Sequence, residues 1–220
     1  MNIENYFKIK ETIPPHVRLV AVSKTKPVEN IQLLYQEGQR IFGENKAQEL
    51  KAKYEELPKD IEWHFIGHLQ TNKIKYIAPF VNLIHSIDSY ALLKEVNRYA
   101  EKNNRILSCL LQFHIALEES KFGFSLEECE KMLAQQEFEQ YKNIQLCGVM
   151  GMATFTHDKE QVRNEFKNLA SYFHQIKAKY FTSDVHFKEI SMGMTEDYQM
   201  AIEEGSTLIR IGSAIFGSRS

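Results

Sequence analysis

Short runs of apolar and β-branched residues alternate with longer segments of helical periodicity along the chain. A short, continuous apolar run bounded by turn residues is typical of a strand that is buried on both faces of a parallel sheet. Eight runs of this kind predict strands, at residues 18–23, 40–43, 62–67, 83–87, 106–115, 145–150, 186–191 and 207–211.

The segments between these runs carry apolar residues three and four positions apart, which is the spacing of an amphipathic helix. Residues 28–38 have such a stripe, and Gly38 can end the helix. Ser89 is a candidate N-cap for a later helix. Ser125 and Glu128, three residues apart, have the spacing of a capping box at the start of another.

Because a helical segment follows each predicted strand, the strands are expected to lie parallel and to be joined by right-handed crossovers. Eight such units within 220 residues predict an α/β fold with one closed (β/α)8 barrel, a TIM barrel, rather than an open sheet. We expect residues 1–220 to form a single domain. Its first dozen residues predict a short extra helix that covers the bottom of the barrel.

The composition is that of an ordinary globular protein, with 43% hydrophobic residues, 25% charged residues and a formal net charge of -2. This balance gives no electrostatic reason to expect a nucleic-acid partner. No apolar run approaches the ~18 residues that a membrane span needs, and the N-terminus lacks the apolar segment of a signal peptide. We therefore expect a cytoplasmic protein.

The three cysteines are widely spaced and predict reduced thiols, with no disulfide and no zinc site. Four histidines lie near predicted strands, but their spacing is not that of a metal site, and we expect no metal ion; they are His64, His68, His85 and His186.

In such a barrel the functional residues lie at the C-terminal ends of the strands. Lys24 is the first charged residue after the first run, and it is either a lip residue that reaches solvent or a working amine. Gly212 and Ser213 follow the last run and begin a helix, where backbone N–H groups favour an anion such as phosphate. Ser191, at the end of the seventh run, could add a hydroxyl donor. A tight turn without a ligand would also explain the glycine.

A lysine amine in a partly desolvated pocket has a lowered pKa, and its neutral form condenses with aldehydes to a Schiff base. A phosphate site beside such a lysine suggests a phosphorylated aldehyde, for which pyridoxal 5'-phosphate is the cofactor-class example and a sugar phosphate is the alternative. Arg210 lies two residues before the predicted phosphate turn and could face the ring. Opposite a pyridine nitrogen, this permanent cation would disfavour protonation and weaken the electron sink of transaminase-type chemistry.

Several longer stretches carry a family resemblance. They are LVAVSKTKP, FGENKAQEL, WHFIGHLQTNK, HSIDS, SKFGF, GVMGMAT and SMGMTEDYQMAIEEGSTLIRIGSAIFG. In register from about residue 18 to residue 217, the chain resembles the YggS/PROSC family, the pyridoxal phosphate homeostasis proteins. The resemblance implies a barrel similar to the N-terminal domain of alanine racemase.

The resemblance also implies that pyridoxal 5'-phosphate is held as an internal aldimine on Lys24 and that Arg210 faces its pyridine nitrogen. The other implied cofactor contacts are Ser191, Gly212 and Ser213 for the phosphate, and Asn45, His64, Ser86, Met150 and Met192 around the ring and its substituents. In one respect the chain departs from the family pattern: His114 stands where an asparagine is usual.

Two classes of function compete: a protein that binds pyridoxal phosphate and serves its homeostasis without efficient turnover, and an amino-acid racemase. Two-base racemisation needs a proton acceptor on each face of the cofactor. In alanine racemase a tyrosine from a further domain of the partner subunit is the second acceptor, and we find no counterpart for it in residues 1–220. We therefore expect a non-catalytic monomer whose partners are pyridoxal phosphate and, as candidates, pyridoxal-phosphate-dependent apo-enzymes.

Overall fold

The structure, a computed structural model, describes residues 1–117 and 122–217. Its strands are β1 (Arg18–Val22), β2 (Ile41–Glu44), β3 (Glu62–Phe65), β4 (Leu83–Ile87), β5 (Leu107–Phe113), β6 (Ile144–Gly151), β7 (Glu189–Ser191) and β8 (Leu208–Ile211). Its α-helices are α1 (Ile3–Thr12), α2 (Val28–Gln36), α3 (Ala47–Glu56), α4 (Ile74–Ile77), α5 (Tyr90–Lys102), α6 (Leu126–Leu133), α7 (Lys159–Tyr180), α8 (Tyr198–Glu203) and α9 (Ser213–Phe216). Two short 3-10 helices are η1 (Thr71–Lys73) and η2 (Gln136–Gln140).

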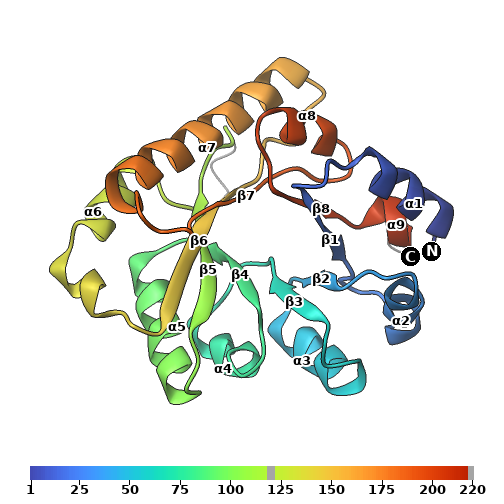
Figure 1. Cartoon of the computed structure of the whole chain (residues 1–220), viewed down its shortest axis with the longest axis horizontal. Helices are drawn as coiled ribbons and strands as arrows, with labels where there is room; N and C mark the ends of the chain where they lie inside the picture. Colours follow the sequence, from blue (N-terminus) through green and yellow to red (C-terminus); the bar gives the residue numbers. More distant parts are fainter. Residues whose placement is uncertain (118–121, 218–220) are drawn as a thin grey trace.

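The strands form a closed parallel barrel in sequence order, β1 to β8, and β8 pairs with β1 (Figure 1). This confirms the predicted (β/α)8 fold. The largest difference from the predicted strands is at β7, which begins at Glu189 and not at residue 186. The reason is a local turn, in which the side chain of Asp184 accepts a hydrogen bond from the backbone N–H of His186 at 2.8 Å.

Side chains along the strands alternate between the barrel interior and the layer between strands and helices. The interior apolar cluster is small, and it consists of Val20, Leu83, Leu110, Met150 and Leu208. The outer layer holds the main hydrophobic core, to which the alternate strand residues such as Leu19, Ala21, Ile209 and Ile211 belong. The alternation therefore decides which strand residues can face a ligand at the barrel mouth.

The predicted helix ends follow local capping chemistry. The hydroxyl of Ser89 accepts from the backbone N–H of Leu92 at 3.3 Å, which confirms it as an N-cap. Ser125 and Glu128 form the predicted capping box at the start of α6. Gly38, after α2, has φ +88, a left-handed conformation in which glycine is unstrained.

The N-terminal helix α1 lies along the side of the barrel and not across its bottom. The backbone N–H of Asn2 donates to the carbonyl of Ile215 at 2.7 Å, and the amide of Asn5 donates to the carbonyl of Ala214 at 2.7 Å. These bonds join α1 to α9, and the two helices lie side by side in Figure 1. The expected position was wrong because α1 is hydrogen-bonded to α9 and packs its buried residues Tyr6 and Ile9 into the outer core.

Within residues 1–117 and 122–217, no helix combines the length and the apolar character needed to cross a bilayer. The three cysteines all lie in this described part, and each is a free thiol.

Candidate functional site

Strands β8, β1 and β2 bring three predicted site residues to one side of the mouth. Val22, two residues before Lys24, is paired in the sheet with Gly43, two residues before Asn45. On its other side Val22 packs against Gly212, where an added Cβ would meet the Val22 carbonyl oxygen at 3.0 Å. Lys24 therefore leaves β1 between the Asn45 segment and the Gly212 turn.

A rim of hydroxyl groups lies beside the Gly212 turn. The hydroxyl of Ser213 donates to that of Thr195 at 3.1 Å, which joins the turn after β8 to the loop after β7. This loop is held by Asp197, whose carboxylate accepts from the backbone N–H of Met194 at 2.5 Å. Thr195 was not among the predicted site residues, although it lies in the stretch that follows the seventh strand; its approach to Ser213 depends on the tertiary fold.

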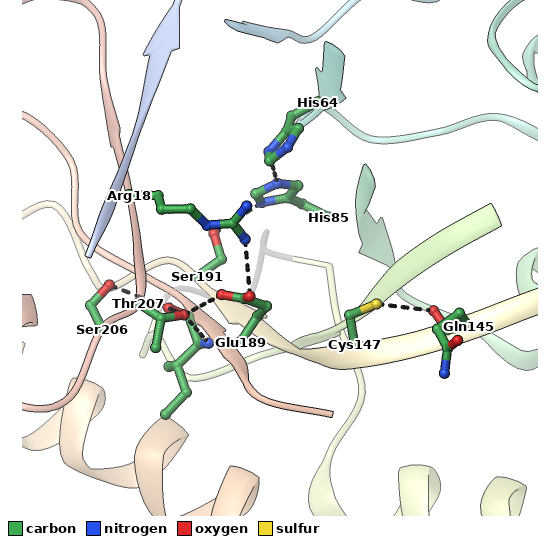
Figure 2. Close-up of polar contacts among 10 residues, drawn as sticks. Arg18, His64, His85, Gln145, Cys147, Glu189, Ser191, Ser206 and Thr207 are labelled. Atoms are coloured by element: carbon green, nitrogen blue, oxygen red, sulfur yellow. Dashed lines mark hydrogen bonds and ion pairs between the residues drawn. The ribbon is translucent and has the colours of Figure 1, made fainter. Parts of the chain in front are cut away.

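A row of hydrogen-bonded polar side chains crosses the barrel interior. Figure 2 shows His64, His85 and Ser191 in this row; the hydroxyl of Ser191 is 2.9 Å from His85 Nδ1, and His85 Nε2 is 3.0 Å from His64 Nδ1. At the other end Arg210 donates from Nη1 to the Ser191 hydroxyl at 2.5 Å and from Nη2 to the Gly151 carbonyl at 3.0 Å. His64, Ser191 and Arg210, predicted separately, thus belong to one buried network.

His85 links these predicted residues, although sequence reasoning considered it only as a metal ligand. Its place on β4 beside His64 on β3 follows from the sheet order, since β3 pairs with β4. Within the described residues, no group of three or more His, Cys, Asp or Glu side chains could hold a metal ion.

Burial keeps both imidazoles of the row neutral. Desolvation lowers the pKa of His64 to about 3, and desolvation with the neighbouring His64 and Arg210 lowers the pKa of His85 well below its ordinary value. Desolvation also lowers the pKa of Arg210 to about 10, which leaves the guanidinium charged at neutral pH. One proton arrangement makes all three contacts hydrogen bonds and uses the Ser191 hydroxyl both as acceptor and as donor: Arg210 donates to Ser191, Ser191 donates to His85 Nδ1, and His85 Nε2–H donates to His64 Nδ1.

An ion pair lies at the opposite, N-terminal end of the interior. Arg18 Nη2 donates to Glu189 Oε1 at 2.9 Å, and the Thr207 hydroxyl donates to Glu189 Oε2 at 2.7 Å (Figure 2). Arg18 and Glu189 are therefore paired with each other, and Arg210 supplies positive charge nearer the mouth.

Two buried polar atoms near the mouth, Ser86 Oγ and Asn45 Oδ1, have no hydrogen-bond partner among the described residues. Ser86 lies in an irregular step of β4, where the register shifts between Ile84 and Ile87 and both isoleucines face the outer core. Buried polar atoms are nearly always hydrogen-bonded. These two atoms therefore fit contacts with a ligand that carries polar substituents.

The two predicted methionines lie on opposite faces of the barrel wall. Met150 is part of the interior cluster and is paired in the sheet with Ser191. Met192 is fully buried in the outer core, because the residue after the inward-facing Ser191 must face outward. Met192 thus faces away from the other predicted site residues, which corrects its expected role as a direct contact.

His114 follows β5, and its backbone N–H donates to the carbonyl of Phe124 at 3.1 Å. This bond joins the end of β5 to the start of the next helical segment. Part of the SKFGF stretch falls in residues 118–121, outside the described residues.

Comparison with known proteins identifies the family. The family model described as the alanine racemase N-terminal domain matches residues 3–220. The pyridoxal phosphate homeostasis protein of Synechocystis sp. is 39% identical over 219 residues, which cover 97% of each chain. The protein of the same name from Aquifex aeolicus is 38% identical over 203 residues, covering 92% of this chain and 87% of that protein. The chain belongs to the pyridoxal phosphate homeostasis family.

Solved structures agree with this membership. One similar structure is that of PipY from Synechococcus elongatus, which has pyridoxal phosphate bound. Its TM-score with this homeostasis-family chain is 0.88 at 32% identity, and the match covers 97% of this chain and 99% of PipY. Alanine racemase from E. faecalis has a TM-score of 0.73 and 16% identity, covering 98% of this chain and 57% of the racemase. The racemase shares the barrel fold, and the closer similarity is to the homeostasis proteins.

Proposed function

We propose that this member of the homeostasis family binds pyridoxal 5'-phosphate reversibly and serves its supply to other enzymes, without efficient catalytic turnover. The observation that carries the proposal is the position of Lys24 between the Asn45 segment and the Gly212 turn, at the mouth toward which Arg210 brings a positive charge. The orphan atoms of Ser86 and Asn45 support a ligand there. The names of the relatives and the ligand of PipY support its identity.

In this proposal Lys24 is the covalent ligand. Its neutral amine adds to the aldehyde carbon of pyridoxal phosphate, a C=N bond replaces the C=O bond, and the aldehyde oxygen leaves as water. Backbone N–H groups at Gly212 and the hydroxyls of Ser213 and Thr195 would bind the phosphate. The hydroxyl of Ser191, expected at the phosphate, contacts Arg210 and His85, so the proposal gives it the role of orienting Arg210.

The charge of Arg210 favours binding over turnover. A buried cation near the pyridine nitrogen disfavours protonation of that nitrogen, since two positive charges would then lie close together. Without that proton the ring withdraws electrons less strongly, which slows the carbanion chemistry of transaminases. Asn45, His64, Ser86 and Met150 would line the ring in this proposal.

An absorbance spectrum tests the covalent ligand. We expect the protein with pyridoxal phosphate to show the near-visible band of a lysine-bound aldehyde, and Lys24→Ala to lose it while its far-ultraviolet circular dichroism is unchanged. Lys26→Ala, with a neighbouring amine removed, is the matched control and should keep the band. An identical band in Lys24→Ala would show that another lysine is the ligand. A protein that never gains the band would favour a sugar-phosphate ligand.

The alternative function, an amino-acid racemase, predicts a different outcome. The loaded protein is incubated with L- or D-alanine, and enantiomeric excess and α-hydrogen exchange are followed. We expect little or no turnover. Several turnovers per second would establish the racemase.

We further propose that the protein is a cytoplasmic monomer and that pyridoxal-phosphate-dependent apo-enzymes receive the ligand from it. Sedimentation and cell fractionation test the first two points. For the third, an apo-enzyme should regain activity from the loaded protein at least as fast as from the same concentration of free pyridoxal phosphate. Slower recovery, at the rate at which the ligand dissociates, would show that transfer is not direct.

A further inference from the structure

A buried charged cluster lies behind Lys24, on the outer face of strands β1 and β2. Lys53 of α3 donates from Nζ to Glu44 Oε1, to Glu49 Oε1 and to the backbone carbonyl of Ser23, each at 2.8 Å. The three N–H groups of its ammonium are thereby all used. Glu44 also accepts from the hydroxyl of Ser23 at 2.6 Å.

This cluster holds both peptide groups that flank Lys24. The carbonyl of Ser23, in the peptide group before Lys24, accepts from Lys53. The N–H of Thr25, in the peptide group after it, donates to Glu49 Oε1 at 2.6 Å. Thr25 has φ +63, a left-handed conformation that a β-branched residue rarely adopts. The backbone on both sides of Lys24 is therefore fixed from behind the barrel wall.

We infer that Glu44, Glu49 and Lys53 are positioning residues for the capture of pyridoxal phosphate by Lys24: they lock its backbone so that the amine is presented to the barrel mouth. This inference rests on the proposed function. The cluster acts through the backbone of Lys24 and not on the ligand, since Glu44 faces the helix layer with its neighbour Phe42.

The charges in this place need a reason beyond stability. A buried ion pair can often be replaced by apolar residues without loss of stability. Here two carboxylates face one ammonium, Glu44 is completely buried, and its Oε2 has no partner among the described residues. Desolvation raises the pKa of Glu44 to about 7, although Lys53 and Ser23 oppose the rise. The charged groups bind the carbonyl of Ser23 and the N–H of Thr25, one on each side of Lys24.

Capture kinetics separate positioning from ligand binding. The full chain and its variants Lys53→Met and Glu49→Ala are mixed with increasing pyridoxal phosphate, and the rate at which the near-visible band forms is fitted to a non-covalent dissociation constant and a limiting rate. We expect the limiting rate to fall about tenfold or more in both variants. The affinity for pyridoxine 5'-phosphate, which lacks the aldehyde, should stay within about twofold. Lys51→Met and Glu55→Ala, with partly exposed side chains on the same helix, are the matched controls.

Amide hydrogen exchange in the ligand-free protein gives a readout independent of loading. The Thr25 N–H should exchange about tenfold faster or more in Glu49→Ala, and Glu49→Gln, whose amide oxygen can accept the same bond, should restore its protection. A limiting rate in Glu49→Ala within about twofold of the wild type would overturn the inference, even if Lys53→Met does not fold. A wild-type protein that forms no band would instead refute the proposed function.

Discussion

The substitution Ser191→Ala tests the interior row most directly. The hydroxyl it removes accepts from Arg210 and lies 2.9 Å from His85 Nδ1, and all three side chains are buried. The variant leaves one guanidinium N–H and one imidazole nitrogen without a partner. Each unsatisfied buried group costs about 1–3 kcal/mol, so the free energy of unfolding should fall by about 2–6 kcal/mol.

The assay is urea unfolding of the ligand-free protein, followed by the fluorescence of the buried Trp63. The midpoint should fall with little change in the denaturant slope, and the melting temperature should fall by roughly 4–24 °C, since each kcal/mol shifts it by about 2–4 °C in a chain of this size. Ser213→Ala is the control, because it removes an exposed hydroxyl whose hydrogen bond is to the rim residue Thr195. Its effect on the free energy of unfolding should stay within about 0.5 kcal/mol.

The same variant distinguishes two roles for Ser191. If its hydroxyl served mainly to bind phosphate, the ligand-free protein would keep its stability and only the affinity for pyridoxal phosphate would fall. A destabilisation below about 1 kcal/mol in the ligand-free protein would refute the interior row. In a double-mutant cycle, His85→Phe and Ser191→Ala should cost less together than the sum of their separate effects, because they share one hydrogen bond.

Three further outcomes follow from the structure. Glu44 has a pKa raised from 4.5 to about 7, so its stabilising contribution is complete below about pH 4.5 and is lost as the pH rises through about 7; the difference is about 3 kcal/mol. Glu44→Gln should remove this part of the pH dependence of the unfolding free energy. If the unfolding free energies of the variant and the wild type fell with equal slope between about pH 5 and pH 8, the assignment to Glu44 would be contradicted. Gly212→Val crowds the carbonyl of Val22 and should weaken pyridoxal phosphate binding about tenfold or more in a titration; unchanged affinity would exclude that turn from the site. Ser125→Ala removes the N-cap of α6 and should lower the free energy of unfolding in urea by about 1 kcal/mol, while the affinity for pyridoxal phosphate stays the same. A clear fall in that affinity would show that α6 is coupled to the mouth.

The order and type of the elements could be predicted because each strand lies in a short run rich in apolar and β-branched residues, and the segments between these runs have helical periodicity. The exact ends of the elements depend on turns that the apolar pattern does not reveal. The turn at Asp184 is an example, and because of it β7 begins three residues later than predicted. The position of α1 could not be predicted from the residues of α1 alone. It depends on hydrogen bonds to α9, such as that of Asn5 to Ala214, which lies 209 positions later in the chain.

Within the site, strand alternation explains both the correct and the incorrect expectations. Ser191 and Arg210 face the interior together, whereas Met192 cannot share the face of Ser191, so its outward position could have been deduced from the sequence. For Ser86 the alternation was no guide, because it lies in the irregular step of β4. His85 shows what pattern reasoning lacks: a histidine beside Ser86 in the same motif was visible, but its partner Ser191 is 106 positions away.

Lys53 illustrates a further limit of the sequence. As a lysine in the middle of a charged helix it has the composition of a solvated face, yet it is almost completely buried. Its contact with Ser23 depends on how α3 packs behind β1, which no local pattern specifies.

The two faces of the wall around β1 suit the proposed capture and release of pyridoxal phosphate. The rim that would bind the phosphate includes the exposed hydroxyl of Ser213, and contacts open to water contribute little net affinity. The backbone of Lys24, in contrast, is held by buried charged groups with short hydrogen bonds. If the phosphate contacts are weak and Lys24 is held rigidly, the covalent bond contributes most of the binding free energy of the ligand. Release should therefore follow the rate at which water or an incoming amine breaks that bond at Lys24, and weakening the phosphate rim should change this rate less than it changes the initial affinity.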